Sequence, residues 1–97
     1  MKKFIGKYVV VRTVSAGVHV GVVDELQGDI CVLTQSRRIW SWEGAFTLSE
    51  ISKNGLATTS KLSETVDEIY LTGVVEVIPC TGAAQAILVI GIDPYVP

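Results

Sequence analysis

The sequence has few of the residues on which catalysis and metal binding depend. Its 97 residues include one histidine, two cysteines and one methionine, and neither GxGxxG nor a GxxxxGK phosphate loop occurs. Nucleophilic catalysis needs a nucleophile beside a positioned base, and a structural zinc site needs four ligands at set spacings. We therefore expect a protein that is not an enzyme and has neither a metal nor a cofactor.

The two cysteines carry no sign of a shared site. Cys31 and Cys80 lie far apart in apolar stretches, outside any CxxC or Cys/His spacing. We expect both to be buried as small hydrophobic side chains in a protein of a reducing compartment.

The chain also lacks a large excess of charge of one sign, and it lacks long apolar runs. Eight basic and ten acidic residues give a net charge of −2, which argues against wholesale attraction to nucleic acid. The longest apolar stretch, AAQAILVIGI, is too short to span a bilayer, and the start MKKFIGKYVVVRT lacks the features of a signal peptide. We expect a soluble, intracellular protein with no membrane contact.

What the chain has in plenty is hydrophobic residues, which make up 48%. The composition does not shift along the chain, so we expect a single domain over 1–97. Val-rich segments around SAG and QGD predict an antiparallel meander, and Pro79 places the last strand at an edge. The predicted strands are 7–14, 17–26, 30–40, 65–72 and 74–80.

A capping box predicts a short helix after the third strand. Thr47 precedes LSE, so we expect its hydroxyl to cap the helix and the Glu50 side chain to return a hydrogen bond to the Thr47 backbone N–H. Leu48 and Ile51 then share one face, and Gly55 stands where a C-terminal glycine is expected. The following segment, 56–64, is polar and predicts a surface loop.

The C-terminal segment is apolar on nearly every side. Residues 83–90 hold one polar side chain, Gln85, and Thr81 can cap a helix there. Such a helix must be buried on more than one side, which favours contact with another subunit and hence a homo-oligomer. The alternative is a strand or coil within the monomer, because ILVIGI is also typical of a strand.

These elements together predict an α+β fold. We expect a small, strongly curved antiparallel sheet of about five strands with one or two short helices. Closure of this sheet into an SH3-like barrel is an open alternative.

The best candidate site is SRRIWSWEGAFTLSE, residues 36–50, which joins two of the three arginines to both tryptophans. In an extended segment Arg38, Trp40 and Trp42 share one face, and Arg37 lies on the other. Arginine suits phosphate or carboxylate, and an exposed indole offers a stacking platform. The alternative is that Trp40, Trp42 and Phe46 cap the core. The arginines are then solvated or paired with Glu43.

Other candidates are weaker. His19 has no positioned nucleophile or carboxylate nearby in sequence, so we expect a surface or subunit-contact residue, with ligand contact as the alternative. Arg12 joins the ligand-binding set if subunits meet near the first hairpin. The pairs Asp24-Glu25 and Asp67-Glu68 point to opposite faces of their strands, which argues against a two-carboxylate site.

The chain also resembles a known family. YVVVRTVSAGVHVG, RRIWSWEGAFTLSEI and VDEIYLTGVVEVIPCT are similar to small proteins of tailed bacteriophages and prophages, over about Tyr8 to Thr81. The end GAAQAILVIGIDPYVP departs from the charged amphipathic helix usual there. The resemblance implies an intracellular accessory protein that acts by binding, and it brings no established site residue.

The leading hypothesis is therefore a homo-oligomeric, non-enzymatic binding protein. It would sequester a cyclic nucleotide or other small anionic ligand and so suppress host antiphage defence. One alternative is a protein-interaction module that inhibits a host protein through exposed apolar residues. Another is a small SH3-like nucleic-acid binder, which the net acidity disfavours.

Overall fold

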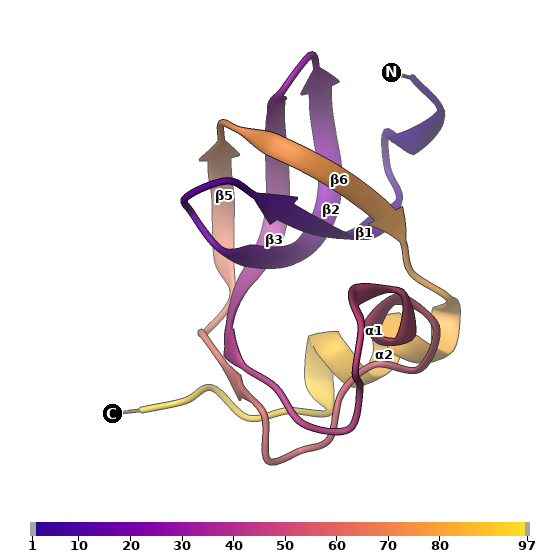
Figure 1. Cartoon of the computed structure of the whole chain (residues 1–97), viewed down its shortest axis with the longest axis vertical. Helices are drawn as coiled ribbons and strands as arrows, with labels where there is room; N and C mark the ends of the chain where they lie inside the picture. Colours follow the sequence, from indigo (N-terminus) through magenta and orange to yellow (C-terminus); the bar gives the residue numbers. More distant parts are fainter. Residues whose placement is uncertain (1, 97) are drawn as a thin grey trace.

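The computed structural model describes residues 2–96 and confirms the α+β fold with a curved antiparallel sheet (Figure 1). Each predicted strand and both predicted helices are present, together with a short 3-10 turn and one extra strand. In chain order the elements are η1 (Lys2–Phe4), β1 (Tyr8–Thr13), β2 (Val18–Gln27), β3 (Ile30–Ser41), α1 (Leu48–Asn54), β4 (Lys61–Leu62), β5 (Val66–Leu71), β6 (Val74–Pro79) and α2 (Gly82–Ile90).

The sheet is open, with β3 as its most paired strand. The strand order is β4-β3-β2-β1-β6, and β5 also pairs with β3. Residues 31–36 of β3 pair with β5, whereas Ile39 and Ser41 pair with β4. No pairing joins β5 to β6 within residues 2–96, so the alternative of a closed barrel is not realised.

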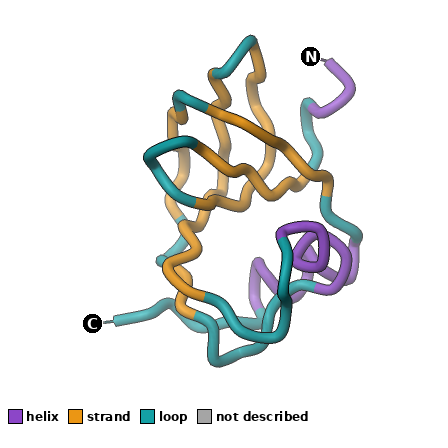
Figure 2. The backbone as a smooth tube through the Cα atoms, viewed as in Figure 1, coloured by secondary structure: helices purple, strands orange, loops and turns teal. Residues whose placement is uncertain are grey.

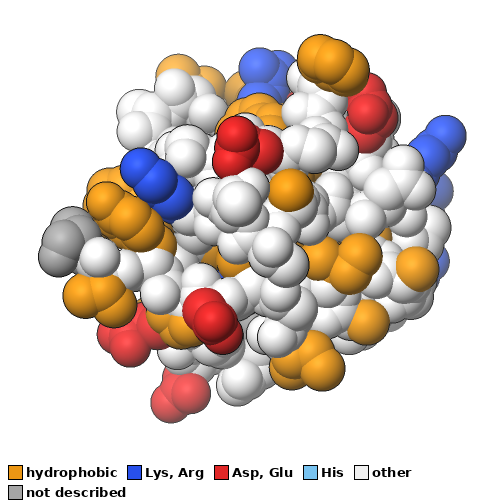
Figure 3. Space-filling model, turned by 90° about the horizontal axis from the view of Figure 1, so that it is seen from below, with side chains coloured by type: hydrophobic (Ala, Val, Ile, Leu, Met, Phe, Trp, Pro, Cys, Tyr) orange, Lys and Arg blue, Asp and Glu red, His pale blue; other side chains and the backbone are white. Residues whose placement is uncertain are grey.

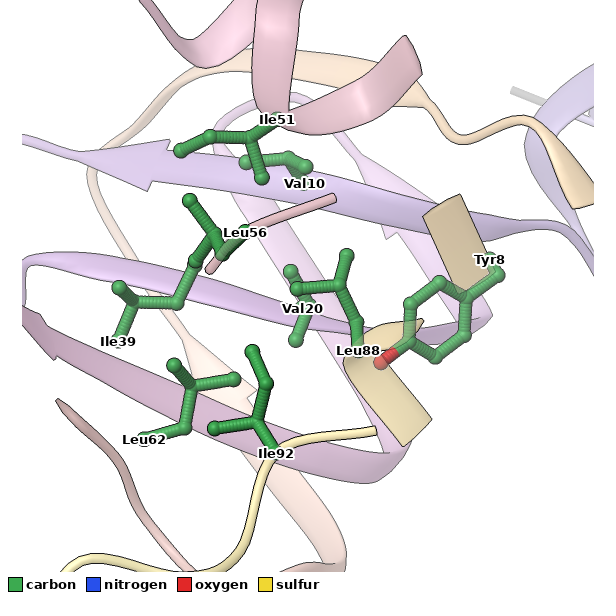
Figure 4. Close-up of a cluster of buried hydrophobic side chains, with 9 residues drawn as sticks. All are labelled: Tyr8, Val10, Val20, Ile39, Ile51, Leu56, Leu62, Leu88 and Ile92. Carbon is green, nitrogen blue, oxygen red and sulfur yellow. The ribbon is translucent and has the colours of Figure 1, made fainter. Parts of the chain in front are cut away.

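Two hydrophobic clusters fill the two faces of this sheet. The first gathers beneath both helices, which lie together at one end of the strands (Figures 2 and 4), and its buried members are Tyr8, Val10, Val20, Ile39, Ile51, Leu56, Leu62, Leu88 and Ile92. The second comprises Val9, Val11, Val23, Cys31, Leu33 and Leu71. The alternation of Val9 and Val11 with Val10 in β1 follows from the period-two geometry of a strand. Both faces of the central strands are therefore buried.

Both helices begin with the threonine cap that the sequence predicts, although within residues 2–96 the Glu50 side chain makes no return bond to the Thr47 N–H. The Thr47 hydroxyl accepts a hydrogen bond from the Glu50 backbone N–H at 3.2 Å, and the Thr81 hydroxyl accepts one from Ala84 at 3.1 Å. Gly55 ends α1 with φ of +74°, and a Cβ there would lie 3.0 Å from the Ile87 side chain. Glycine thus permits both the helix end and its close contact with α2.

An irregularity in β3 shapes the site described below. Val20 pairs with Arg37 but Val22 pairs with Thr34, so β3 holds an extra residue between them. Gln35 lies there with φ of +49°, a backbone conformation that non-glycine residues rarely adopt. Bulges of this kind redirect side chains and recur beside functional sites.

The structure of segment 56–64 contradicts the prediction of a surface loop there. Leu56, Ser60 and Leu62 are buried, and Lys61–Leu62 forms β4 against the end of β3. The Ser60 hydroxyl accepts a hydrogen bond from the Glu43 backbone N–H at 2.9 Å. The expected surface loop was wrong because this largely polar segment contains two leucines, Leu56 and Leu62, that complete the first cluster.

Helix α2 buries one side within the single chain. Ala84 and Leu88 are fully buried, whereas Val89 is 44% and Ile90 82% exposed. The apolar outer side is what led us to expect a second subunit, and the homo-oligomer stays a prediction.

Candidate functional site

Arg37 is a buried cation on the helix-covered face of β3. Only 2% of it is exposed. Its Nε donates to the Ser63 carbonyl at 2.8 Å, and its Nη1 donates to the Leu88 carbonyl at 2.7 Å. These two bonds tie β3 to the segment before β5 and to the last turn of α2.

Part of this arrangement is structural. The last carbonyls of a helix have no partner within it, and cations near that end are favoured by the helix dipole. Arg37 supplies such a partner to Leu88, which lies in the final turn of α2. The third guanidinium nitrogen, Nη2, is buried and has no hydrogen-bond partner.

Tyr8 contributes a second buried polar atom without a partner. It is 4% exposed, lies beside Leu88 at one end of the first cluster (Figure 4), and its hydroxyl makes no hydrogen bond. Tyr8 and Arg37 line one cavity of about 310 Å³ with Val22, Gln35, Thr65, Gln85 and Val89. We call this the Arg37 cavity. A buried donor without a partner is costly, so two of them in one cavity point to a ligand that bonds both.

The charges around the cavity favour an anion. Within residues 2–96 no carboxylate lies within ion-pair distance of Arg37, and the one salt bridge joins Arg12 to Glu76 at 3.2 Å. Burial lowers the pKa of the Arg37 guanidinium, while Tyr8 and Asp93 raise it. Burial also raises the pKa of the Tyr8 phenol, as does Cys80, whereas Arg37 lowers it. The cavity therefore holds a guanidinium and a neutral phenol, both of them donors.

The structure separates the six residues that the sequence grouped as ligand-binding. Arg37 lines the cavity just described. His19, Arg38 and Trp40 line a different hollow on the opposite face of β3. Arg12 and Trp42 line a third, next to α1.

Two expectations about individual side chains were wrong. Trp42 lies beyond the end of β3 and packs against the first cluster, so it does not share a face with Trp40, which is 62% exposed. His19 is fully buried, not a surface residue. The pleat does turn it away from Val18 and Val20, but the opposite face of this sheet is also covered.

The comparisons with known proteins give one result. A family described as "Domain of unknown function (DUF6948)" matches residues 6–88. The chain belongs to this family. No curated protein and no solved structure matches it. The match to DUF6948 covers every residue that lines the Arg37 cavity except Val89.

Sequence reasoning missed most of the cavity of this DUF6948 member. Tyr8, Gln35, Thr65 and Gln85 come from four separate segments and meet only through the fold. One signal was available: Gln85 is the single polar side chain in an apolar helix. Gln35 gave none, because the bulge that places it follows from strand pairing.

Residues 2–96 offer neither a metal cluster nor a membrane-spanning helix. No three His, Cys, Asp or Glu side chains gather there as a metal ion would require. No helix in that range has the length and apolar character needed to cross a membrane.

Proposed function

We propose that this protein is a non-enzymatic binding module that captures a small anionic ligand in the Arg37 cavity. The observation that carries the proposal is the pair of buried, unpartnered donors, Arg37 Nη2 and the Tyr8 hydroxyl, in one cavity. A phosphate or carboxylate oxygen would satisfy both, and an arginine fork suits either group.

The size and rim of the cavity narrow the ligand. Small-molecule sites span about 300–1,000 Å³, and this cavity of about 310 Å³ is at the lower end. A ligand no larger than one nucleotide fits that volume. The two donors are shielded from solvent, so a lining side chain must move, and Gln35 and Gln85 are long and exposed.

The resemblance to small phage and prophage proteins supplies the context. In that setting the protein acts stoichiometrically, sequestering a nucleotide signal of host defence such as a cyclic mononucleotide. Affinity and abundance then determine the effect, and no turnover is involved.

A thermal-shift panel tests this function. The probes are inorganic phosphate, 5′-AMP and cyclic AMP, with adenosine as the neutral control. A ligand at 100 times its Kd stabilises the fold by about 2.7 kcal/mol, and it is released intact on denaturation. No shift with any anion, together with no nucleotide in the purified protein, overturns the proposal.

One observation favours a second candidate, a protein-interaction module that blocks a host protein. Phe46 is 95% exposed and Tyr70 63% exposed, and large exposed aromatic residues are typical anchors of interfaces. A single host protein that co-purifies with the wild type and is lost with Phe46→Ser supports this candidate.

The face of the molecule in Figure 3 gives little support to nucleic-acid binding. On the face that Figure 3 shows, Lys and Arg side chains lie apart from one another and form no patch. Binding to a phosphate backbone draws on several such contacts together.

We propose in addition that the protein forms a homo-oligomer through α2. Exposed Val89 and Ile90 give α2 an apolar outer side that a second copy would cover. Light scattering coupled to size exclusion measures the mass, and Ile90→Lys is the variant expected to reduce it.

A further inference from the structure

A second hollow on the other face of β3 holds two more buried polar atoms without partners. His19 is fully buried and Ser36 is 1% exposed, and neither His19 Nδ1 nor Ser36 Oγ makes a hydrogen bond. Both residues line a hollow of about 220 Å³ with Arg38, Trp40, Ser63, Val66 and Ile69. We call this the His19 hollow.

The hydrogen bond of His19 defines what its other nitrogen offers. Nε2 lies 2.9 Å from the Ala16 carbonyl, which can only accept, so Nε2 carries the proton. Burial lowers the pKa of the ring; the Ala16 bond raises it, and Arg38 lowers it again. The net lowering keeps the ring neutral at physiological pH, and Nδ1 is then a buried acceptor.

The remaining lining is equally specific. The Ser36 hydroxyl can donate or accept. The Ser36 backbone lies close to Gly21, where a Cβ would be 3.2 Å from the Ser36 Cα. Trp40 is 62% exposed, so its indole is open to stacking, and Val66 is 41% exposed. Arg38 is an exposed cation that pairs with His19 across the two strands.

We propose that the His19 hollow binds a single planar ring that carries an N–H beside a carbonyl, as in a pyrimidine base of the uracil type. The ring N–H donates to His19 Nδ1, and the neighbouring carbonyl accepts from Ser36 Oγ. Both atoms are shielded from solvent in the free protein, so a lining side chain of the hollow must move when the ring enters. The ring stacks on Trp40, and Arg38 reaches the second carbonyl or, in a nucleotide, the phosphate carried by the sugar.

The observations favour this class over others. A free anion would find Arg38 but would leave His19 Nδ1 without a donor. An apolar ligand would leave both buried polar atoms unpaired, which is unfavourable. A cytosine ring presents an acceptor where uracil presents its N–H, so it would face Nδ1 with the wrong group. The small volume selects one ring over two.

The test uses the fact that His19 is the only histidine. Protein labelled with ¹⁵N-histidine gives one pair of ring signals, and a hydrogen bond donated to Nδ1 moves its signal upfield. The probe is 1-methyluracil, whose only N–H is the one proposed to bind. The control is 1,3-dimethyluracil, which lacks it. We expect the first to shift Nδ1 with at least about tenfold higher affinity, because the control leaves a buried acceptor unpaired.

Two variants identify the stacking residue. Trp40→Ala changes an exposed side chain, so folding is preserved, and it should weaken 1-methyluracil binding about tenfold through lost stacking. Trp42→Phe keeps the packing of Trp42 and should leave the affinity unchanged. Equal losses in both variants would contradict the proposed stacking.

Three results overturn the proposal. In the first, saturating 1-methyluracil leaves the Nδ1 signal unmoved. In the second, the dimethylated control moves it equally. In the third, inorganic phosphate produces the same shift, which would make the His19 hollow an anion site without selectivity for the ring. The proposal does not depend on the Arg37 cavity, and failure of phosphate to bind there would leave it intact.

Discussion

Arg37 and Arg38 are consecutive in β3 and end up in opposite surroundings. Arg37 is buried beneath α2, with two of its nitrogens bonded to backbone carbonyls. Arg38 is exposed, and its backbone N–H donates to the Ser63 hydroxyl at 2.7 Å. Ser63 thus supports both, because its carbonyl accepts from Arg37 while its hydroxyl accepts from Arg38.

The difference shows how one strand can serve two kinds of recognition. On the helix-covered face, burial leaves a guanidinium with an unused donor, which selects for negative charge. On the other face, a neutral imidazole and a hydroxyl select for the pattern of donors and acceptors, and the cation lies at the rim. The same residue type therefore has a central role on one face and a peripheral role on the other.

The largest expected effect is the loss of anion affinity when Arg37, but not Arg38, is replaced. Arg37→Met should weaken binding of 5′-AMP at least about 100-fold, since breaking a buried ion pair costs about 3–5 kcal/mol. Arg38→Met should change it less than about threefold. Calorimetric titration measures both affinities, and circular dichroism confirms that each variant is folded. Similar losses in the two variants would contradict the division between the faces.

How much of this division the sequence could reveal depends on the level of structure. The strands around SAG and QGD and the helices capped by Thr47 and Thr81 depend on local chemistry, and they were predicted. The burial of His19 could not be predicted, because alternation places it on the face away from Val20 without saying whether that face is covered. Covering depends on β5 and β6, which reach the sheet from a distant part of the chain.

The same limit applies to the arginines. Alternation separated Arg37 from Arg38, but it could not say which one points toward the helices. That choice depends on the bulge at Gln35 and on the placement of α2, whose Leu88 carbonyl accepts from Arg37. Tyr8 carried no signal at all, since a tyrosine at the start of a Val-rich strand is typical of any core.

Tyr8→Phe sharpens the comparison on the Arg37 side. The variant removes a buried hydroxyl that has no partner, so the ligand-free protein should gain about 1 kcal/mol of unfolding free energy. Its affinity for 5′-AMP should fall about tenfold, because one donor to the anion is lost. Urea denaturation and calorimetric titration give the two values. A loss of stability would show that the hydroxyl already has a partner in the free protein.

Ser36→Ala makes the matching change on the His19 side. It also removes an unpartnered buried hydroxyl, and we expect a gain of about 0.5–1 kcal/mol in unfolding free energy. Affinity for 5′-AMP should stay within about twofold of the wild type, because Ser36 lies in the other hollow. If Ser36→Ala weakens anion binding as much as Tyr8→Phe does, the two sites are coupled.

The smallest expected effect is a pH dependence of the unfolding free energy, which arises from His19 and not from the Arg37 cavity. The pKa of His19 is lowered in the folded protein, chiefly by burial, whereas the pKa of a histidine in an unfolded chain is about 6.5. Above that pH the ring is neutral in both states and stability does not depend on it. As the pH falls below about 6.5, the unfolded chain takes up a proton that the folded chain does not, so stability declines. Urea midpoints between pH 7.5 and about 5.5 should therefore decrease in the wild type and decrease less in His19→Gln. In the labelled wild type, a His19 pKa at or above about 6.5 would contradict this account whether or not the variant folds.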